Sequence, residues 1–335
     1  TALASFLPDH VVTNEDLAMK YPQIEIKPGV SIQNTPDEIF KRCGIKERRS
    51  VQGQMTSSEM AIKAIQALVK KTGVSLREID IVIVATSLPD CFFPSTAALV
   101  VDKFKMKKCL AFDMPAACSG WVFGVENAAL SLLVEGSYKN RWKKAIVVSA
   151  DPVSKTLNNY NYRTGILFGD AAVAALIEQE SSDSTGFLVN NTLTEVVPGF
   201  PKDVYHLTPW GLPLGKNWLD EQFQLDGLGV YERGVEFTKR FVRQYCRRFQ
   251  VNKNKIDYFI PHQSNARMLE KLNAELKFGD RLLSNIESVG NTVASSTPLC
   301  LLDFQEKEQF KTGDRIMLCS FGAGYTLGIV DLEVI

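Results

Sequence analysis

The chain repeats one order of elements twice, and this duplication limits the folds it can adopt more than any other feature. In the first stretch, apolar residues at helical spacing predict a helix over 59–71, followed by an apolar strand over 79–84. In the second stretch, a helix predicted over 235–249 precedes a similar strand over 256–260. Both strands open with the pair Ile-Asp. The two stretches therefore begin alike.

The elements after these two strands also follow one order. Each strand leads into a helix, a second strand, a corner that contains glycine, another helix and a third strand. The ranges predicted for the first stretch are 96–104, 109–113, 121–133 and 145–150, and those for the second stretch include 266–276, 281–286 and 316–320.

Strands that alternate with helices predict an α/β fold with buried, mainly parallel strands. A duplicated unit predicts two such halves packed pseudo-symmetrically, which we place at 1–180 and 186–335. The polar run over 178–184 has the composition of a linker between them. Two insertions, 151–167 and 196–226, interrupt the repeat, and loops of this kind tend to carry specificity.

Length and charge narrow the classes of protein further. At 335 residues the chain fits two domains, or two halves that share a central layer. No segment approaches the roughly 18–20 unbroken apolar residues that a membrane span needs. Lys plus Arg and Asp plus Glu both number 38, so the chain has no net field for nucleic acid or for an anionic membrane. We expect neither as a partner.

Cysteine and histidine usage points to a reduced protein without a metal. The seven cysteines include no CxxC pair, and no secretory signal opens the chain. These features predict a reducing cytoplasm. None of the three histidines lies close in sequence to another histidine or to a cysteine, which argues against a zinc site. We expect no metal and no cofactor.

One cysteine stands where a catalytic thiol is expected. Cys118 lies in Ala-Ala-Cys-Ser-Gly, after the strand predicted over 109–113 and directly before the helix predicted over 121–133. A thiol at a helix N-terminus faces unpaired N–H groups and the positive end of the helix dipole, which favour the thiolate. On residue frequency alone, the alternative is a buried core cysteine.

Two polar residues are predicted to meet this thiol. Asn291, in Val-Gly-Asn-Thr, occupies the corner of the second half that the duplication matches to the Cys118 corner. His262 follows the strand over 256–260, at whose carboxyl end α/β proteins place ligand-binding groups. Taken singly, Asn291 fits a turn or cap and His262 fits a hydrogen-bonded loop histidine. If the halves meet about a pseudo-dyad, the three side chains converge.

Short motifs spread over nearly the whole chain are specific when taken together. They are Leu7-Pro8, Val11-Val12-Thr13-Asn14, Arg42-Cys43-Gly44-Ile45, Glu47-Arg48, Ala116-Ala117-Cys118-Ser119-Gly120, Phe168-Gly169-Asp170, Pro261-His262-Gln263-Ser264-Asn265, Gly290-Asn291-Thr292 and Ser320-Phe321-Gly322-Ala323-Gly324. With them, the sequence resembles the β-ketoacyl-acyl-carrier-protein synthase III family of the thiolase superfamily. The resemblance implies a thiolase-like α/β fold with two duplicated βαβαβ-type halves in a five-layered α-β-α-β-α arrangement.

The resemblance also implies a mechanism in two half-reactions. Cys118 takes an acyl group from a thioester primer, and the backbone N–H groups of Cys118 and Ala323 hold the oxyanion. A malonyl-type or β-ketoacyl thioester on a carrier then supplies the carbon nucleophile that attacks the acyl group on Cys118. For a malonyl unit, His262 and Asn291 donate hydrogen bonds to the enolate that forms as carbon dioxide leaves. The family commonly has Gly where Ala323 stands.

The resemblance assigns further residues to substrate and carrier. Phe93 borders the acyl pocket, Arg42 approaches the phosphates of the incoming carrier, and Arg163 matches an adenine contact. Asn265 joins these substrate-binding residues. Arg267 matches a position that meets the acidic acyl carrier protein.

One departure bears on the primer. Glu38 stands where the family often has a Trp that stacks on the adenine of coenzyme A. We therefore expect an acyl carrier protein as partner, with coenzyme A thioesters as the alternative source of the acyl group. The family usually forms homodimers, which is the expected assembly.

Other functions remain open at this stage. The same three residues would suit an enzyme that joins two longer acyl chains, of the pyrone or resorcinol type, or one that passes an acyl group to oxygen or nitrogen. A biosynthetic thiolase is disfavoured because Cys319 is out of register with its second cysteine. A dinucleotide-binding oxidoreductase is disfavoured because 322–324 lies too near the last residue for a βαβ unit. A non-catalytic partner subunit would not need the three residues.

Overall fold

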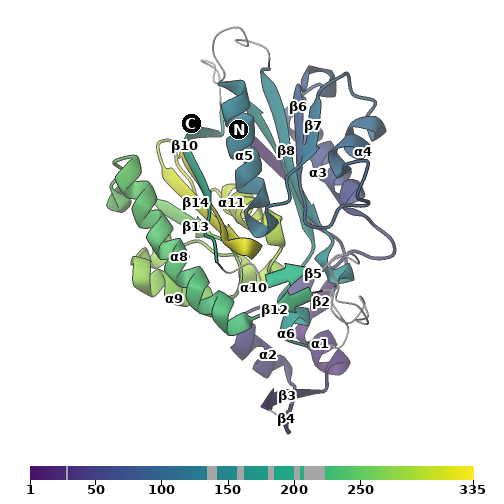
Figure 1. Ribbon diagram of the computed structural model, residues 1–335, viewed down its shortest axis with the longest axis vertical. Coiled ribbons are helices and arrows are strands. Elements are labelled where there is room, and N and C mark those ends of the chain that lie inside the picture. Colours follow the sequence, from purple (N-terminus) through teal and green to yellow (C-terminus); the bar gives the residue numbers. More distant parts are fainter. Residues whose placement is uncertain (28, 134–141, 157–161, 180–184, 200–203, 207–222) are drawn as a thin grey trace.

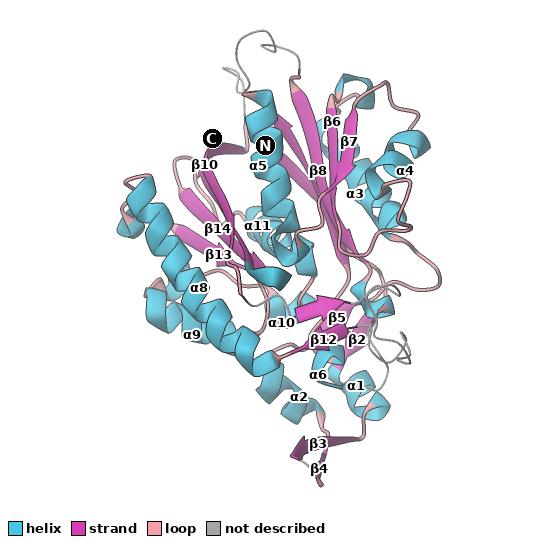
Figure 2. Ribbon diagram, viewed as in Figure 1, coloured by secondary structure: helices cyan, strands magenta, loops and turns pink. Residues whose placement is uncertain are grey.

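The computed structural model describes residues 1–27, 29–133, 142–156, 162–179, 185–199, 204–206 and 223–335. Two main sheets, one from each half, lie with helices between them and helices on both outer faces (Figure 1 and Figure 2). The molecule therefore has the five layers α-β-α-β-α that the resemblance implies.

The sheet of the N-terminal half has the strand order β1-β9-β8-β6-β7. Strand β6 is buried at every position because helices cover both faces of the sheet. Strands β6, β7 and β8 run parallel, whereas β9 is antiparallel to both β8 and β1. The bounds are β1 (Ala2–Phe6), β6 (Ile81–Ala85), β7 (Leu110–Asp113), β8 (Lys144–Asp151) and β9 (Ala171–Glu178).

The sheet of the C-terminal half has the order β10-β15-β14-β13, with β13 and β14 parallel. Strand β15 is antiparallel to both of its neighbours. The prediction of mainly parallel strands is thus wrong for the last strand of each half. A turn of three residues joins β14 to β15, and so short a connection can join only antiparallel neighbours. The bounds are β10 (Phe187–Val196), β13 (Tyr258–Pro261), β14 (Arg315–Gly322) and β15 (Thr326–Val334).

Each helix layer buries its apolar face on a sheet. Helices α3 and α4 pack on the outer face of the first sheet through residues such as Leu68 and Val100. Helices α8 and α9 cover the second sheet through Phe241 and Leu272. Helices α5 and α11 lie between the sheets, where one apolar cluster contains side chains from both halves. The bounds are α3 (Ser57–Thr72), α4 (Thr96–Lys103), α5 (Gly120–Leu132), α8 (Gly227–Arg248), α9 (Ala266–Leu276) and α11 (Ser296–Glu306).

Helix α3 shows how the sequence fixes such an element. The Thr56 hydroxyl accepts a hydrogen bond from the Glu59 N–H, and the Glu59 carboxylate accepts one from the Thr56 N–H. Gly73 ends the helix in the left-handed conformation, with φ of 71°. Between these caps, Met60 and Leu68 lie on a buried stripe, where a large apolar side chain contributes about 1.5–3 kcal/mol relative to exposure. The predicted helix is confirmed with slightly wider bounds.

Smaller elements gather at the end of the molecule that is lowest in Figure 1. Most of the predicted insertion 196–226 lies outside the described residues. The described small elements are β2 (Val11–Thr13), α1 (Asn14–Lys20), β3 (Gln23–Lys27), β4 (Val30–Gln33), α2 (Pro36–Cys43), β5 (Glu47–Arg49), α6 (Tyr162–Gly165), β11 (Val204–His206), β12 (Phe223–Leu225) and α10 (Ile286–Val289).

Two further predictions meet the structure differently. The strand predicted over 281–286 reduces to a single bridge between Leu282 and Phe259. Side-chain bonds replace the ladder there, because the Ser284 hydroxyl donates to the Gln263 side chain and accepts from the Ile286 N–H. The division into halves at 1–180 and 186–335 stays a prediction, since the central apolar cluster draws on both. Among the described helices, none is both long and apolar enough to cross a bilayer.

Candidate active site

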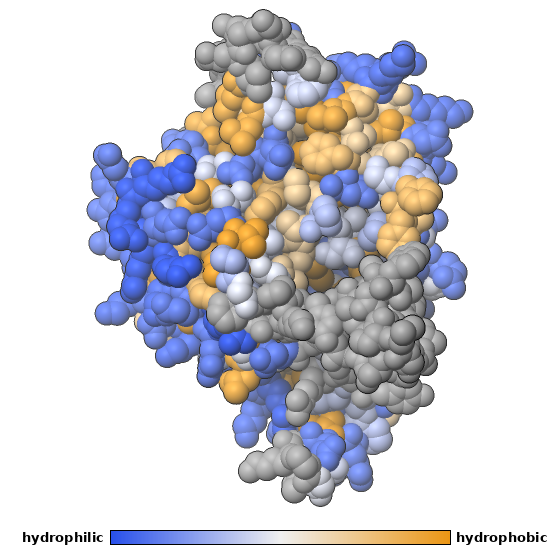
Figure 3. Space-filling view, viewed as in Figure 1, coloured by the Kyte–Doolittle hydropathy of each residue, from blue (hydrophilic) through white to orange (hydrophobic). Residues whose placement is uncertain are grey.

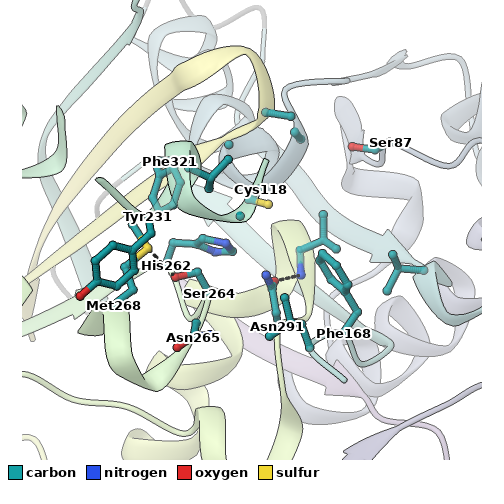
Figure 4. A pocket seen from close by; sticks show the side chains of 18 of the residues that line it. Ser87, Cys118, Phe168, Tyr231, His262, Ser264, Asn265, Met268, Asn291 and Phe321 are labelled. Atoms are coloured by element: carbon teal, nitrogen blue, oxygen red, sulfur yellow. Dashed lines mark hydrogen bonds between the residues drawn. The ribbon is translucent and has the colours of Figure 1, made fainter. Parts of the chain in front are cut away.

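A cavity of about 1090 Å³ lies between the halves, and Cys118, His262 and Asn291 all line it. Their side chains face one another across it (Figure 4). They come from different elements, because Cys118 precedes α5, His262 follows β13 and Asn291 precedes α11. The predicted convergence is therefore present. Apolar side chains that pack around Cys118 complete this wall, namely Leu88, Val153, Leu167, Phe168 and Val293.

The two corners that the duplication matches have the same backbone. Cys118 sits in the 3-10 turn η2 (Ala117–Ser119), which opens at Ala117 with φ of 48° and runs into α5. In the other half, the turn η8 (Val293–Ser295) opens at Val293 with φ of 52° and runs into α11. A positive φ is uncommon for a β-branched residue such as valine. The two turns lie against each other.

The Cys118 thiol is not the ready thiolate that its position predicts. Burial raises the pKa of the Cys118 thiol to about 12, and the nearby charge of Asp151 acts in the same direction. The Cys118 N–H opposes these effects but does not outweigh them. At neutral pH the sulfur therefore carries its proton. The prediction of a favoured thiolate is wrong because the helix N-terminus lies inside the protein.

Gly322, at the end of β14, packs closely against the Cys118 corner and forms a clamp there with Thr326 and Ser119. A Cβ atom built on Gly322 would lie 2.8 Å from the Cys118 nitrogen and 3.0 Å from the Ala116 oxygen. The Thr326 hydroxyl donates to the Ala116 carbonyl at 3.1 Å, and the Ser119 hydroxyl donates to the Thr326 carbonyl at 2.8 Å. This clamp brings the turn η9 (Ala323–Tyr325) beside Cys118, and Ala323 also lines the cavity. Ala323 is not among the residues with positive φ, so alanine suits its backbone.

His262 is held as a neutral ring. The backbone N–H of His262 donates to the Cys319 carbonyl at 2.8 Å, which continues the β13–β14 pairing. The ring packs edge-on against Phe321, with centroids 5.3 Å apart. Burial lowers the pKa of His262 to about 3, so the imidazole is uncharged at physiological pH.

Ser296 contacts one ring nitrogen of His262. The Ser296 oxygen lies 2.6 Å from His262 Nδ1 and also accepts the Gln263 N–H at 3.4 Å. We take the Ser296 hydroxyl as the donor to Nδ1. We therefore assign the proton of the neutral ring to Nε2, which makes Nε2 a donor.

Asn291 is oriented by its own corner. The backbone N–H of Asn291 donates to the Leu167 carbonyl at 2.8 Å, and the backbone carbonyl of Asn291 accepts the Gly169 N–H at 3.0 Å. These bonds tie the two halves together. The Asn291 side-chain oxygen accepts the Val293 N–H at 3.0 Å. The amide NH₂ group is thereby left to face the cavity (Figure 4). Neutral donors on one wall thus face a thiol on the other.

Comparison with known proteins places this site in a family. Residues 112–194 match the family described as 3-oxoacyl-[acyl-carrier-protein (ACP)] synthase III, and residues 246–334 match its C-terminal part. The chain is 33% identical to the beta-ketoacyl-[acyl-carrier-protein] synthase III of Phocaeicola vulgatus, over 98% of this chain and 94% of the relative. This chain belongs to the 3-oxoacyl-[acyl-carrier-protein] synthase III family.

Further relatives agree in sequence and in structure. A beta-ketoacyl-[acyl-carrier-protein] synthase III of Bacteroides thetaiotaomicron is 34% identical over 98% of this chain and 94% of its own. The crystal structure of 3-oxoacyl-(acyl carrier protein) synthase III from Pseudomonas aeruginosa superposes with a TM-score of 0.84, at 27% identity, over 99% of this chain and 98% of the other. As a member of this family, the chain is an acyl-transferring condensing enzyme with a thiolase-like fold.

Two of the predicted substrate-binding residues line the cavity. Arg42 does so from α2, where its guanidinium forms an ion pair with Glu38 at 2.7 Å. Asn265 also lines it, and its side chain caps α9 by accepting the Arg267 N–H at 2.8 Å. Glu38 thus partly neutralises the charge of Arg42.

The other predicted contacts lie elsewhere. Phe93 is 86% exposed and is not among the described residues that line the Cys118 cavity, because its loop runs along the surface between β6 and α4. The expectation that Phe93 borders the acyl pocket is therefore wrong for the cavity of a single chain. The side chain of Arg163 lies outside the described residues. Arg267 donates to the Lys41 carbonyl at the end of α2 and pairs with Glu270, so its guanidinium is already engaged.

The structure adds residues that sequence reasoning missed. Asp151 ends β8 and lines the cavity beside Ser87, and the aromatic ring of Tyr231 lines it from α8. The sequence feature that could have indicated Asp151 is an aspartate at the end of an apolar strand. A tyrosine within a helix, such as Tyr231, has no comparable feature. In the part of the chain that the structure describes, no group of three or more His, Cys, Asp or Glu side chains could hold a metal ion.

Proposed function

We propose that this condensing enzyme acylates Cys118 from an acyl thioester and then joins the acyl group to a malonyl-type unit on an acyl carrier protein. One observation carries the proposal: a half-buried thiol and two oriented neutral donors line a single cavity from opposite halves. The acyl carrier protein appears in the names of the relatives, and we propose the same carrier for this chain.

In the first half-reaction, the sulfur of Cys118 attacks the thioester carbonyl and releases the carrier thiol. The backbone N–H groups of Cys118 and Ala323 are proposed to hold the oxyanion. Support comes from the clamp at Gly322, which keeps the two backbone segments in contact. The apolar wall around Cys118 suits an acyl chain rather than a charged group.

In the second half-reaction, loss of carbon dioxide leaves an enolate, which attacks the acylated Cys118. We propose that His262 Nε2 and the Asn291 amide donate to the enolate oxygen as charge develops on it. A neutral ring suits this role because it can donate at every pH above about 3, where its pKa lies. The Ser296 contact supports the required tautomer.

For the source of the primer, we propose an acyl carrier protein rather than coenzyme A. The Glu38 carboxylate forms an ion pair with Arg42, which lines the cavity, and a carboxylate offers neither stacking for adenine nor attraction for phosphate. Faster acylation of Cys118 by an acyl-coenzyme A than by the same acyl group on a carrier protein would contradict this assignment.

For assembly, we propose a homodimer through the β7 edge of the first sheet. β7 is the last strand of that sheet, and edge strands present unpaired backbone groups to a partner. Apolar residues gather in this region of the surface, whereas hydrophilic residues gather over α8 and α9 (Figure 3). Phe92 and Phe93, on the loop before α4, are 64% and 86% exposed. Light scattering of the purified protein tests the assembly.

We also propose a reducing cytoplasm as the compartment. All seven cysteines are free thiols in the structure, which supports a protein that works without disulfides.

The test of the activity is intact-protein mass spectrometry after incubation with a panel of acyl thioesters. We expect one acyl mass on the wild-type chain and none on Cys118→Ala. Release of carbon dioxide from a malonyl carrier thioester then separates condensation from the alternatives. An enzyme that joins two long acyl chains, or that acylates an oxygen or nitrogen, would acylate Cys118 without releasing carbon dioxide from malonyl units.

A further inference from the structure

Arg48 is a buried cation to which the two half-reactions above assign no role. It lies on β5, is 2% exposed and forms no ion pair with a carboxylate among the described residues. Its Nε atom also has no hydrogen-bond partner in the part of the chain that the structure describes. A buried charge without an opposite charge beside it destabilises a fold. Stability alone therefore does not account for an arginine at this position.

Two hydrogen bonds hold the guanidinium group of Arg48 between separate elements. Nη1 donates to the Asn14 side-chain oxygen at 2.8 Å, and Nη2 donates to the Ile166 carbonyl at 2.5 Å. Asn14 is buried on α1, and its amide in turn donates to the Ile45 carbonyl at 2.8 Å. Hydrogen bonds from a charged donor are about twice as strong as those between neutral groups. Arg48 thus fixes the Ile166 carbonyl, which follows α6, to α1 and β5.

Residues 166–170 lie between β5 and Asn291. On one side, the backbone of Asn291 pairs with them through the two hydrogen bonds described above and through an isolated parallel bridge to Phe168. Phe168 lies beside Asn291 in Figure 4. On the other side, the Asp170 N–H donates to the Arg49 carbonyl at 2.8 Å. The segment is therefore placed like the middle strand of a small sheet, with β5 and Asn291 as its neighbours.

The side chain of Arg48 also packs against the glycines of this pairing. A Cβ atom built on Gly169 would lie 3.1 Å from the Arg48 Cβ, and one built on Gly290 would lie 3.2 Å from it. The backbone just before β5 also bonds to α10, because the Lys46 N–H donates to the Glu287 carbonyl at 2.8 Å. In Figure 1, α10 and β5 lie together near the lower end of the molecule. Arg48 therefore touches both segments that place the donor asparagine.

We propose that Arg48 is a positioning residue for the condensation step: its guanidinium holds residues 166–170 in place, and these residues aim the Asn291 amide into the cavity. This inference rests on the proposed function of Asn291 as a donor to the enolate oxygen. Arg48 is not among the described residues that line the cavity, so it acts through its neighbours. Acylation of Cys118 uses no hydrogen bond from Asn291. Loss of Arg48 should therefore affect the second half-reaction and spare the first.

The first test is Arg48→Met. Methionine keeps an unbranched side chain against Gly169 and Gly290 but donates no hydrogen bond. Since a displacement of about 1 Å can cost about 10²-fold in rate, carbon dioxide release from a malonyl carrier thioester should fall by about 10- to 10²-fold. Acylation of Cys118, followed by intact-protein mass spectrometry, should stay within about threefold. Equal loss of both half-reactions, or release at the wild-type rate, would overturn the proposal.

Arg315→Met is the matched control for a general loss of stability. Arg315, on β14, pairs with the buried Asp331 carboxylate at 2.6 Å and is not among the described residues that line the cavity. Its removal leaves a buried charge unpaired, so the unfolding temperature should fall at least as far as in Arg48→Met. The ratio of carbon dioxide release to acylation should nevertheless stay within about twofold of the wild type. A ratio that falls equally in both variants would overturn the proposal, because loosening of the fold would then explain the loss.

A double variant distinguishes action through Asn291 from a separate structural role. If Arg48 acts by aiming the Asn291 amide, its effect should disappear once that amide is gone. In the Asn291→Ala background, Arg48→Met should therefore change carbon dioxide release by no more than about twofold. Losses that multiply in the double variant would show that Arg48 acts independently of Asn291 and would overturn the proposal.

Asn14→Ala tests the same contact from its other side and keeps the inference testable if Arg48→Met does not fold. It removes the oxygen that accepts from Nη1, so carbon dioxide release should fall relative to acylation, by less than in Arg48→Met. An unchanged ratio in Asn14→Ala would contradict the proposal. If Asn291→Ala alone releases carbon dioxide at the wild-type rate, the proposed function of Asn291 fails, and this inference fails with it. A loss in Asn291→Ala without a loss in Arg48→Met removes this inference alone.

Discussion

The Cys118 corner and the Asn291 corner have the same backbone but carry different side-chain chemistry. Both open with a non-glycine residue at positive φ, Ala117 in one half and Val293 in the other, and both lead into a central helix. The thiol of Cys118 lies at the first corner, and Asp151 lines the same cavity. Around the second lies a neutral donor, Asn291, with His262 beside it. Duplication has supplied the scaffold, and divergence has divided the chemistry between the halves.

This division makes the two half-reactions separable by mutation. Changes on the nucleophile side should stop acylation and therefore everything after it. Changes on the donor side should stop only the condensation. The four variants below test that difference, beginning with the largest expected effect.

Replacing the nucleophile should abolish both half-reactions. A serine hydroxyl at the Cys118 position is a far weaker nucleophile in the same place, so acylation should fall by about 10³-fold or more in Cys118→Ser. Intact-protein mass spectrometry measures it. Cys91→Ser is the matched control because Cys91 is exposed and does not line the described cavity. An acyl mass that persists in Cys118→Ser would place the nucleophile elsewhere.

Removing one donor should affect condensation alone. In Asn291→Ala, the enolate loses one hydrogen bond, which corresponds to about 2.7–4 kcal/mol, or about 10²–10³-fold in rate. Carbon dioxide release from a malonyl carrier thioester measures this loss, and acylation of Cys118 should stay within a few-fold. Asn127→Ala on α5 is the control, since that amide donates to the Phe123 carbonyl and Asn127 is not among the described residues that line the cavity. Equal loss of both half-reactions would remove the distinction between the corners.

Loosening the clamp between the β14–β15 turn and Cys118 should weaken both half-reactions moderately. In Gly322→Ala the new methyl group would meet the Cys118 nitrogen and the Ala116 oxygen, so the turn must shift. We expect acylation to fall by about 10-fold and the free energy of unfolding to fall by about 1–3 kcal/mol. Thermal unfolding and single-turnover acylation measure the two effects.

Gly324→Ala is the control for that clamp. It has a strained φ of 71° but no atom within 4 Å of the added methyl group. It should lose stability without a selective loss of acylation. If Gly324→Ala and Gly322→Ala lose acylation equally, contact with the Cys118 corner is not what matters.

The smallest effect is expected where this chain departs from its family. Ala323→Gly restores the residue common in the family, yet Ala323 has no positive φ, so its backbone N–H is already free of strain. Acylation should change by no more than about twofold. A large gain in rate would mean that the Ala323 side chain, rather than its backbone, limits the oxyanion site.

The sequence was sufficient to predict the architecture and the meeting of three residues. The repeat predicted that two corners would match. Cys118 and His262 were predicted to lie near each other because both follow strands, and strand ends converge in α/β folds. The antiparallel β15 was missed because period and polarity do not reveal strand direction. The strand predicted over 281–286 is wrong because hydrogen bonds of the Ser284 and Gln263 side chains take the place of a strand ladder.

The electrostatic character of the site could not be predicted from the sequence. Helix position alone favours a Cys118 thiolate, whereas burial between two halves reverses the direction of the pKa shift. The depth of a residue depends on packing across the pseudo-dyad, which involves residues far apart in sequence. The same limit applies to Phe93, which the resemblance places at the border of the acyl pocket and which lies exposed.

One pulse-and-chase measurement tests the division between the halves most directly. Wild-type chain and His262→Ala are acylated on Cys118, freed of excess primer and then given a malonyl carrier thioester, while intact mass is followed with time. The account predicts that both chains take up the acyl mass, that the wild type loses it during the chase, and that His262→Ala keeps it. Failure of His262→Ala to take up the acyl group, or its discharge at the wild-type rate, would contradict the account.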